Sequence, residues 1–161
     1  MKQNMKYILT IFALIFVAGV VYTPQSASAT ANTKVDLFQD RSAGGVEAID
    51  MVGPAGFGFL NFNQTNDGDL RLLVVLKNAE PNTTYEGAFL ACGPDHSSAC
   101  DFVDVGELTT NTQGNGTAIM HLSVETLQAS PFGPGARTDH FDMIGPDGDI
   151  YAAGGVNYLV P

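Results

Sequence analysis

Tryptophan is absent from this sequence, cysteine occurs only twice, and lysine and arginine together account for just 7 of the 161 residues. Against these stand 17 acidic side chains, so the formal net charge is −10 at pH 7. An acidic chain without a basic cluster is unsuited to binding nucleic acid or an anionic membrane. The lack of tryptophan disfavours a sugar-binding cleft, for which Tyr85, Tyr151 and Tyr158 would be the candidate stacking side chains.

Long amphipathic helical runs are also missing, while 18 glycines and 8 prolines are spread along the chain. Between them, short segments alternate between two faces. In Leu70–Lys77 (LRLLVVLK), one face carries Leu70, Leu72, Val74 and Leu76, and the other, which is apolar in its middle and charged at its ends, carries Arg71, Leu73, Val75 and Lys77. This alternation is typical of strands, and its recurrence at roughly ten-residue spacing favours a β-sandwich. The sequence therefore predicts an all-β fold, a single antiparallel sandwich of about 7–9 strands, immunoglobulin-like or related.

The expected strands share apolar alternation and flanking turn residues. They lie at 35–39, 46–52, 56–63, 70–77, 83–90, 101–108, 117–124, in a hairpin around 140–155, and at 156–160. Residues 126–136 contain two prolines and two glycines and are expected to form a loop. A helix at 46–52 or at 124–130 is the alternative for those two segments.

Residues 1–29 have the organisation of a signal peptide. Lys2 and Lys6 precede a run of 16 mainly apolar residues, and Ala27 and Ala29 form a small-residue cleavage site. The run is shorter than the ~20 residues that span a bilayer, although an uncleaved anchor is the alternative. Cleavage near Ala29 would leave one domain, residues 30–161, outside the membrane, secreted or in the cell envelope, with 5 basic against 17 acidic groups.

Cys92 and Cys100 enclose a short loop in the sequence ACGPDHSSAC. An even number of cysteines in an exported chain predicts a disulfide. The spacing matches neither the C-x2-C of thioredoxin-like enzymes nor the usual paired cysteines of a zinc site. The disulfide is therefore expected to have a structural role.

Two turn motifs in the middle of the chain support a more specific comparison. The first is Pro81-Asn82-Thr83-Thr84-Tyr85; the second runs from Gly106-Glu107-Leu108-Thr109-Thr110-Asn111 to Gly114-Asn115-Gly116. The stretch from Leu70 to Val124 that contains them resembles uncharacterised exported β-sandwich domains of bacteria and archaea. The resemblance covers about a third of the chain and implies the fold, but it carries no catalytic residues.

His96, His121 and His140 are the only histidines, and Asp95, Asp139 and Asp142 are the acids considered with them. Imidazole with carboxylate suits copper or zinc, so these histidines are the candidate metal ligands. Their spacing forms no recognised metal motif, and unrelated surface histidines are the competing interpretation.

Calcium is a further possibility at the acidic turns Asn63–Gly68 and Asp147–Asp149. The first resembles the start of an EF-hand loop, but Val74 stands where that loop needs a bidentate glutamate. An ordinary β-turn explains both segments equally well.

No nucleophile motif such as G-x-S-x-G is present, so the sequence predicts no enzymatic activity and no obligatory cofactor. Three N-x-S/T sequons place possible glycosylation at Asn63, Asn82 and Asn115. The expected function is a binding, adhesion or structural module whose partner is an unknown protein or envelope component, of neutral or basic charge if a protein. A small exported metal-binding protein is the alternative.

Overall fold

The structure is a computed structural model that describes residues 33–40, 55–93, 100–129, 133–156 and 158–160. These residues form antiparallel strands and one short helix, which confirms the all-β prediction. The strands are β1 (Thr33–Asp40), β2 (Ala55–Gln64), β3 (Leu70–Leu76), β4 (Thr84–Cys92), β5 (Asp101–Thr109), β6 (Gly116–Leu122), β7 (Arg137–Ile144) and β8 (Ile150–Gly154), and the helix is α1 (Val124–Ala129). The strand expected at 46–52 lies outside the described residues.

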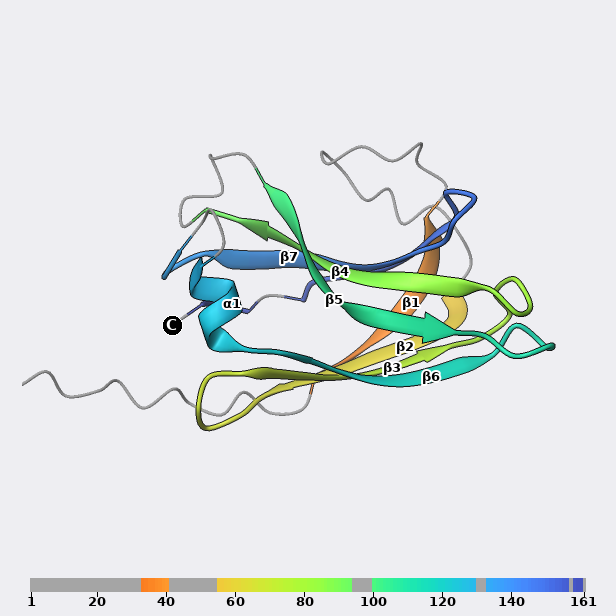
Figure 1. Cartoon of the computed structure of the whole chain (residues 1–161), viewed down its shortest axis with the longest axis horizontal. Helices are drawn as coiled ribbons and strands as arrows, with labels where there is room; N and C mark the ends of the chain where they lie inside the picture. The colour runs from red at the N-terminus through yellow and green to blue at the C-terminus, as the bar shows by residue number, and fades with distance from the viewer. Residues whose placement is uncertain (1–32, 41–54, 94–99, 130–132, 157, 161) are drawn as a thin grey trace, which may run out of the picture.

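The strands pair in the order β5-β4-β7-β8-β1-β2-β3-β6. This sheet folds over on itself, so that the two end strands, β5 and β6, lie beside each other and nearly close it. Figure 1 shows the resulting two layers facing each other. We refer to β1, β2, β3 and β6 as the first layer and to β5, β4, β7 and β8 as the second layer.

Strand β3 shows how the sequence produces this arrangement. Leu70, Leu72, Val74 and Leu76 are fully buried between the layers, and the residues that alternate with them face outward. Successive side chains of a strand point to opposite faces, so one apolar set fills the core. This division of the strand confirms the sequence prediction.

A glycine pair makes room for a side chain where the sheet nearly closes. Gly87 of β4 lies directly opposite Gly106 of β5. A Cβ atom on Gly87 would lie 2.9 Å from the sulfur of Met120, which is buried and comes from β6. The missing side chains therefore let a residue of the first layer pack against the edge of the second layer.

Two tyrosine hydroxyls form hydrogen bonds to hairpin turns, one turn in each layer. The Tyr158 hydroxyl donates to the Gly68 carbonyl at 2.6 Å, in the turn between β2 and β3. The Tyr85 hydroxyl donates to Asp149 Oδ2 at 2.8 Å, in the turn between β7 and β8. Both rings are buried, as is that of Tyr151, so the tyrosines are core residues and do not form a sugar-stacking platform.

Two segments after β6 differ from the expectation. The segment expected as a loop from residue 126 begins as helix α1, which was the alternative for residues 124–130. Ser123 caps this helix: Ser123 Oγ accepts a hydrogen bond from Thr126 N at 3.2 Å. The strand expected at 156–160 is a single bridge between Leu159 and Arg137. A side chain makes one of the hydrogen bonds that a regular strand would make through its backbone: the Thr138 hydroxyl accepts a hydrogen bond from Tyr158 N at 2.9 Å.

The predicted disulfide is present between Cys92, at the end of β4, and Cys100, which precedes β5. It therefore links the two ends of the β4–β5 connection and supports the structural role inferred from the sequence. Within the described ranges, no helix has the length and apolarity needed to cross a membrane.

Candidate binding surface

The outward side of the first layer combines residues of all four of its strands. Their registers align two rows across the layer: Lys34, Asn61, Leu73 and Ile119 form one, and Asp36, Phe59, Val75 and Thr117 form the other. Asn63, Arg71 and His121 form a shorter third row. We define these eleven residues, together with Lys77 at the end of β3, as the cationic face.

The centre of the cationic face is apolar. Ile119 is 63% exposed and lies opposite Leu73 of the neighbouring strand. Val75 lies two residues further along β3 and is also only half-buried. An outward sheet face in contact with water normally carries polar residues, so this cluster leaves apolar surface available to a partner.

Cations surround this apolar centre. Of the four lysine and arginine residues in the described part of the chain, Lys34, Arg71 and Lys77 lie on this face, and only Arg137 lies elsewhere. The Lys34 ammonium sits 4.5 Å from the centroid of the Phe59 ring, a cation–π contact. Asp36 is the single carboxylate of the face. A strongly acidic protein thus has one face with a local excess of positive charge.

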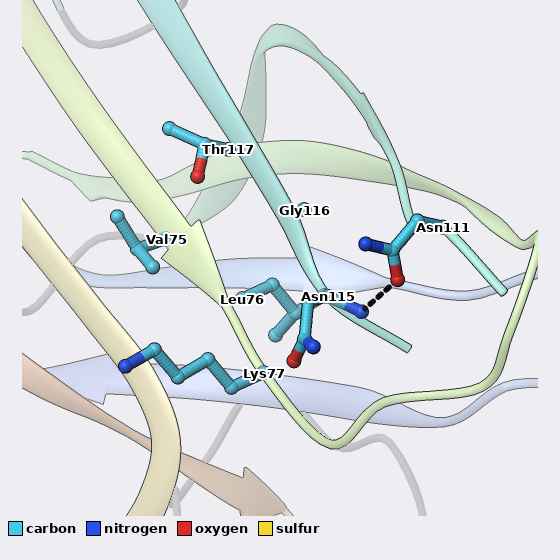
Figure 2. A pocket seen from close by; sticks show the side chains of 7 residues that line it. All are labelled: Val75, Leu76, Lys77, Asn111, Asn115, Gly116 and Thr117. Atoms are coloured by element: carbon cyan, nitrogen blue, oxygen red, sulfur yellow. Dashed lines mark hydrogen bonds between the residues drawn. The ribbon is translucent and has the colours of Figure 1, made fainter. Parts of the chain in front are cut away.

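The cationic face is hollowed at two places. A hollow of about 220 Å³ is lined by Asn61, Asn63, Arg71, Leu73 and Ile119. A larger one of about 410 Å³ lies at the end of β3 and the start of β6 and is lined by Val75, Leu76, Lys77, Asn111, Asn115, Gly116 and Thr117 (Figure 2). Asn115 N donates to Asn111 Oδ1 at 3.1 Å, so the turn bordering this hollow is held in place.

The outward side of the second layer has the opposite charge. Glu86, Asp104 and Glu107 surround a hollow of about 210 Å³ between β4 and β5. Glu86 lies directly opposite Glu107, a like-charge pairing that is unfavourable for the sheet itself. Phe102, on the same strand as Asp104, is 41% exposed. We define these four residues as the acidic face.

Next to the acidic face, the outward side of β7 carries a buried histidine–aspartate pair. His140 Nε2 lies 3.3 Å from Asp142 Oδ2, and the two side chains are only 7% and 5% exposed. The other carboxylate oxygen, Asp142 Oδ1, is buried and has no hydrogen-bond partner among the described residues. Such a pair is costly to bury and sensitive to the loss of either member.

A second histidine–aspartate pair lies in solvent at the border of the cationic face. His121 Nε2 is 3.1 Å from Asp69 Oδ2, and the His121 side chain is 57% exposed. Asp69 Oδ1 also accepts a hydrogen bond from Val124 N at 2.9 Å, at the start of α1. The carboxylate is thereby fixed between the helix and the imidazole.

Of the three histidines predicted as metal ligands, the structure describes two, and these two do not lie together. His121 projects from the first layer and His140 from the second, while His96 lies outside the described residues, as does Asp95. No group of three or more His, Cys, Asp or Glu side chains that would hold a metal occurs in the part of the chain that the structure describes.

The two acidic turns considered for calcium have the geometry of hairpin turns. Gly68 and Gly148 have φ angles of 92° and 83°, a region that glycine readily adopts. In each turn the glycine N–H donates to the carbonyl three residues before it, that of Thr65 or Gly145. The Asp149 carboxylate already accepts the Tyr85 hydroxyl.

The three sequons lie at strand ends and turns. Asn82 is exposed in the turn before β4, with a φ of 52°. Asn63 is half-buried at the end of β2, where it lines the smaller hollow, and Asn115 borders the larger one. Asn82 is thus the most accessible of the three.

Burial changes the ionisation of the anchoring tyrosines. Desolvation, followed by the nearby Asp69 carboxylate, raises the pKa of Tyr158 to about 12. Desolvation and the hydrogen bond to Asp149 raise the pKa of Tyr85 well above its ordinary value of 10.0. Both hydroxyls therefore remain protonated, as hydrogen-bond donors must.

Comparisons with known proteins identify no family: no protein-family model and no curated protein matches the sequence. Two solved structures are similar in part, a single mutant and a double mutant of a SOD-like protein from Bacillus subtilis. Their TM-scores are 0.49 and 0.46 at 16% and 14% identity, and the alignments cover 78% and 76% of this chain and 99% and 95% of theirs. We base no functional argument on a likeness of this size.

The sequence did not reveal the cationic face, because its members come from segments that are distant in sequence. The outward residues of β3 were visible as a partly apolar set, but only the strand registers place Leu73 beside Ile119 and Arg71 beside His121. The sequence signal that could have pointed to this face is the scarcity of lysine and arginine, since two of the few cations, Arg71 and Lys77, lie on the same side of one expected strand.

Proposed function

We propose that this protein is an exported, non-enzymatic binding module whose binding surface is the cationic face. Its partner is a protein surface that presents carboxylates around an apolar centre. The observation that carries the proposal is the gathering of three cations around exposed aliphatic side chains on a chain of net charge −10. Interfaces commonly combine an apolar centre with a polar rim, and arginine is enriched in them.

The overall charge limits how such a partner binds. Long-range repulsion opposes an acidic partner, and for this reason the sequence alone favoured a neutral or basic one. At physiological ionic strength, however, the Debye length is only about 8 Å, so distant carboxylates are largely screened. Contacts within the face then decide the outcome, and these favour carboxylates near Arg71, Lys77 and Lys34.

Export is the second part of the proposal and is supported by two features. One is the apolar run with its small-residue cleavage site before residue 30. The other is the disulfide between Cys92 and Cys100, a bond that persists in oxidising compartments outside the cytosol. Peptide mass mapping of the protein from the envelope and medium of its host tests both, with Thr30 as the expected first residue.

The binding surface is tested by NMR titration of the isotope-labelled protein with poly-L-glutamate at 0.15 M salt. Chemical-shift changes are expected on β2, β3 and β6. The variant Arg71→Gln/Lys77→Gln should bind about tenfold more weakly, since each surface ion pair contributes only a few tenths to 1 kcal/mol. Arg137→Gln, which removes a cation outside the face, is the matched control. Equal weakening by both variants would refute the proposed surface.

Metal binding is the second candidate function, and the two histidine–aspartate pairs are the observation that favours it. Imidazole nitrogen and carboxylate oxygen suit copper or zinc, and the exposed His121–Asp69 pair offers both. Calorimetric titration with Cu²⁺, Zn²⁺ and Ca²⁺ tests this function. Stoichiometric binding that is lost in His121→Ala or His140→Ala would support it, and the absence of binding at micromolar metal would exclude it.

A further inference from the structure

We propose that the carboxylate surface recognised by the cationic face is the acidic face of a second copy of this chain. The inference rests on the proposed function and names its partner. Copies would then associate head to tail, the first layer of one against the second layer of the next.

The two faces are complementary in charge. The cationic face carries Lys34, Arg71 and Lys77 against the single carboxylate of Asp36, whereas the acidic face carries Glu86, Asp104 and Glu107 without a cation. The unfavourable Glu86–Glu107 pairing in particular would be relieved by a cation placed above it. Opposite charges across an interface also fix the register of association.

The two faces are complementary in apolar surface as well. Ile119 and Phe102 are two of the three large apolar side chains most exposed in the described residues, at 63% and 41%, and each face contains one of them. Stacking copies face to face would cover both residues. A homotypic contact of cationic face with cationic face would cover Ile119 but would bring like charges together.

The contact is heterologous, because the two faces lie on different layers of the sandwich. A copy that uses its cationic face still has its acidic face free for the next copy. Heterologous contacts of this kind build open assemblies or rings and cannot form a closed two-fold dimer with one contact. The expected product is therefore a series of oligomers whose mean size grows with concentration.

The size of the faces predicts weak association. The cationic face spans four strands about 4.8 Å apart and about seven residues long, or roughly 440 Å², whereas the acidic face lies on the two strands β4 and β5, so the contact buries at most about 440 Å² on each copy. The total of at most about 900 Å² is below the roughly 1,200 Å² at which stable complexes begin. An interface of this size is in the range of weak, transient contacts between neighbouring molecules.

Sedimentation velocity at 0.15 M salt tests the inference with the protein purified from an exporting host. Two charge-reversal variants are compared: Arg71→Glu/Lys77→Glu on the cationic face and Glu86→Lys/Glu107→Lys on the acidic face. Each variant alone should associate at least tenfold more weakly than the unaltered chain. Circular dichroism melting curves of all variants serve as the control for folding.

Combining the reversals makes the test specific for head-to-tail contact. A chain that carries all four substitutions regains complementary faces and should associate again. The two charge-reversal variants should also associate with each other when mixed, because one then presents two acidic faces and the other two cationic faces. Reversals that leave association unchanged, or a folded chain with all four substitutions that stays monomeric, would overturn the inference.

The unaltered protein separates failure of this inference from failure of the proposed function. If the unaltered chain is monomeric up to about 1 mM but poly-L-glutamate still perturbs β3 and β6, the face binds carboxylates and the second copy is excluded as its partner. If neither association nor polymer binding is observed, both proposals are wrong.

Discussion

The outward sides of the two layers differ more than their inward sides do. Inward, both layers present apolar residues to one continuous core, for example Leu72 from β3 and Phe141 from β7. Outward, the first layer exposes aliphatic side chains among cations, whereas the second layer has carboxylates beside a buried histidine–aspartate pair. The inward residues thus account for the fold. The two layers differ in the charge and the exposed apolar surface of their outward residues.

The two histidine–aspartate pairs also differ between the layers, because one is exposed to solvent and the other is buried. Both have nitrogen–oxygen distances near 3 Å, 3.1 Å in the first layer and 3.3 Å in the second. The pair in the first layer is solvated, so water replaces a lost partner at little cost. The pair in the second layer is buried, so water does not readily replace a member that is lost.

The largest predicted effect comes from breaking the buried pair. Asp142→Ala should lower the free energy of unfolding by about 3–5 kcal/mol, because it removes the buried carboxylate that lies 3.3 Å from the His140 imidazole. Asp69→Ala, the matched change in the exposed pair, should cost about 1 kcal/mol, mainly through the hydrogen bond to Val124 N. Urea unfolding of both variants measures the difference.

Replacing both members of the buried pair tests whether the loss of stability in Asp142→Ala comes from the polar group that it leaves buried. His140→Leu/Asp142→Ala removes both polar groups, and it should be markedly more stable than Asp142→Ala alone. Equal losses in Asp142→Ala and Asp69→Ala would show that burial does not separate the two pairs.

The next largest loss of stability is expected for a core residue of β3, and it can be compared with a substitution on the outward side of the same strand. Leu72→Ala removes a fully buried side chain from the core and should cost about 3 kcal/mol, by lost transfer energy and the cavity left behind. Leu73→Ala, one residue along on the cationic face, should cost less than about 1 kcal/mol because its side chain is only half-buried. Thermal or urea unfolding gives both values, and similar losses would contradict the assignment of inward and outward sides.

The sequence was sufficient to predict the features that depend on local patterns. Alternation identified β3 and its buried side, and the cysteine spacing identified the disulfide. Helix α1 was expected only as the alternative for residues 124–130, because its capping residue, Ser123, directly follows a strand and was not recognised as a cap. The cationic face was missed for a different reason: it exists only once registers bring separate strands together, as with Leu73 and Ile119.

High pH should weaken the tyrosine anchors of both layers, in contrast to the substitutions above, each of which acts on one layer. Tyr158 has a folded-state pKa of about 12 against an ordinary value of 10.0, so between these values the folded chain keeps a proton that the unfolded chain releases. Stability is therefore fully present below pH 10 and is lost as the pH rises towards 12, by about 2–3 kcal/mol for this residue. Tyr85, whose pKa is raised by burial, acts in the same direction from the second layer.

Urea unfolding between pH 8 and pH 11.5 measures this loss. Tyr158→Phe should be less stable than the unaltered chain at pH 8, because the hydrogen bond to the Gly68 carbonyl is gone. Its stability should, however, fall less steeply above pH 10. Parallel slopes for the two proteins would show that Tyr158 does not titrate as its burial requires.

The smallest effect on stability is expected from a substitution that weakens association. Ile119→Ser changes a side chain that is 63% exposed, so unfolding should shift by no more than about 0.5 kcal/mol. If the cationic face docks a partner, the same change removes apolar contact from the centre of the interface and should weaken self-association several-fold in sedimentation velocity. Phe102→Ser on the acidic face should weaken it in the same way, because head-to-tail contact uses both residues. A loss confined to Ile119→Ser would mean that the cationic face binds something other than the acidic face, and the outward sides of the two layers would then serve unrelated purposes.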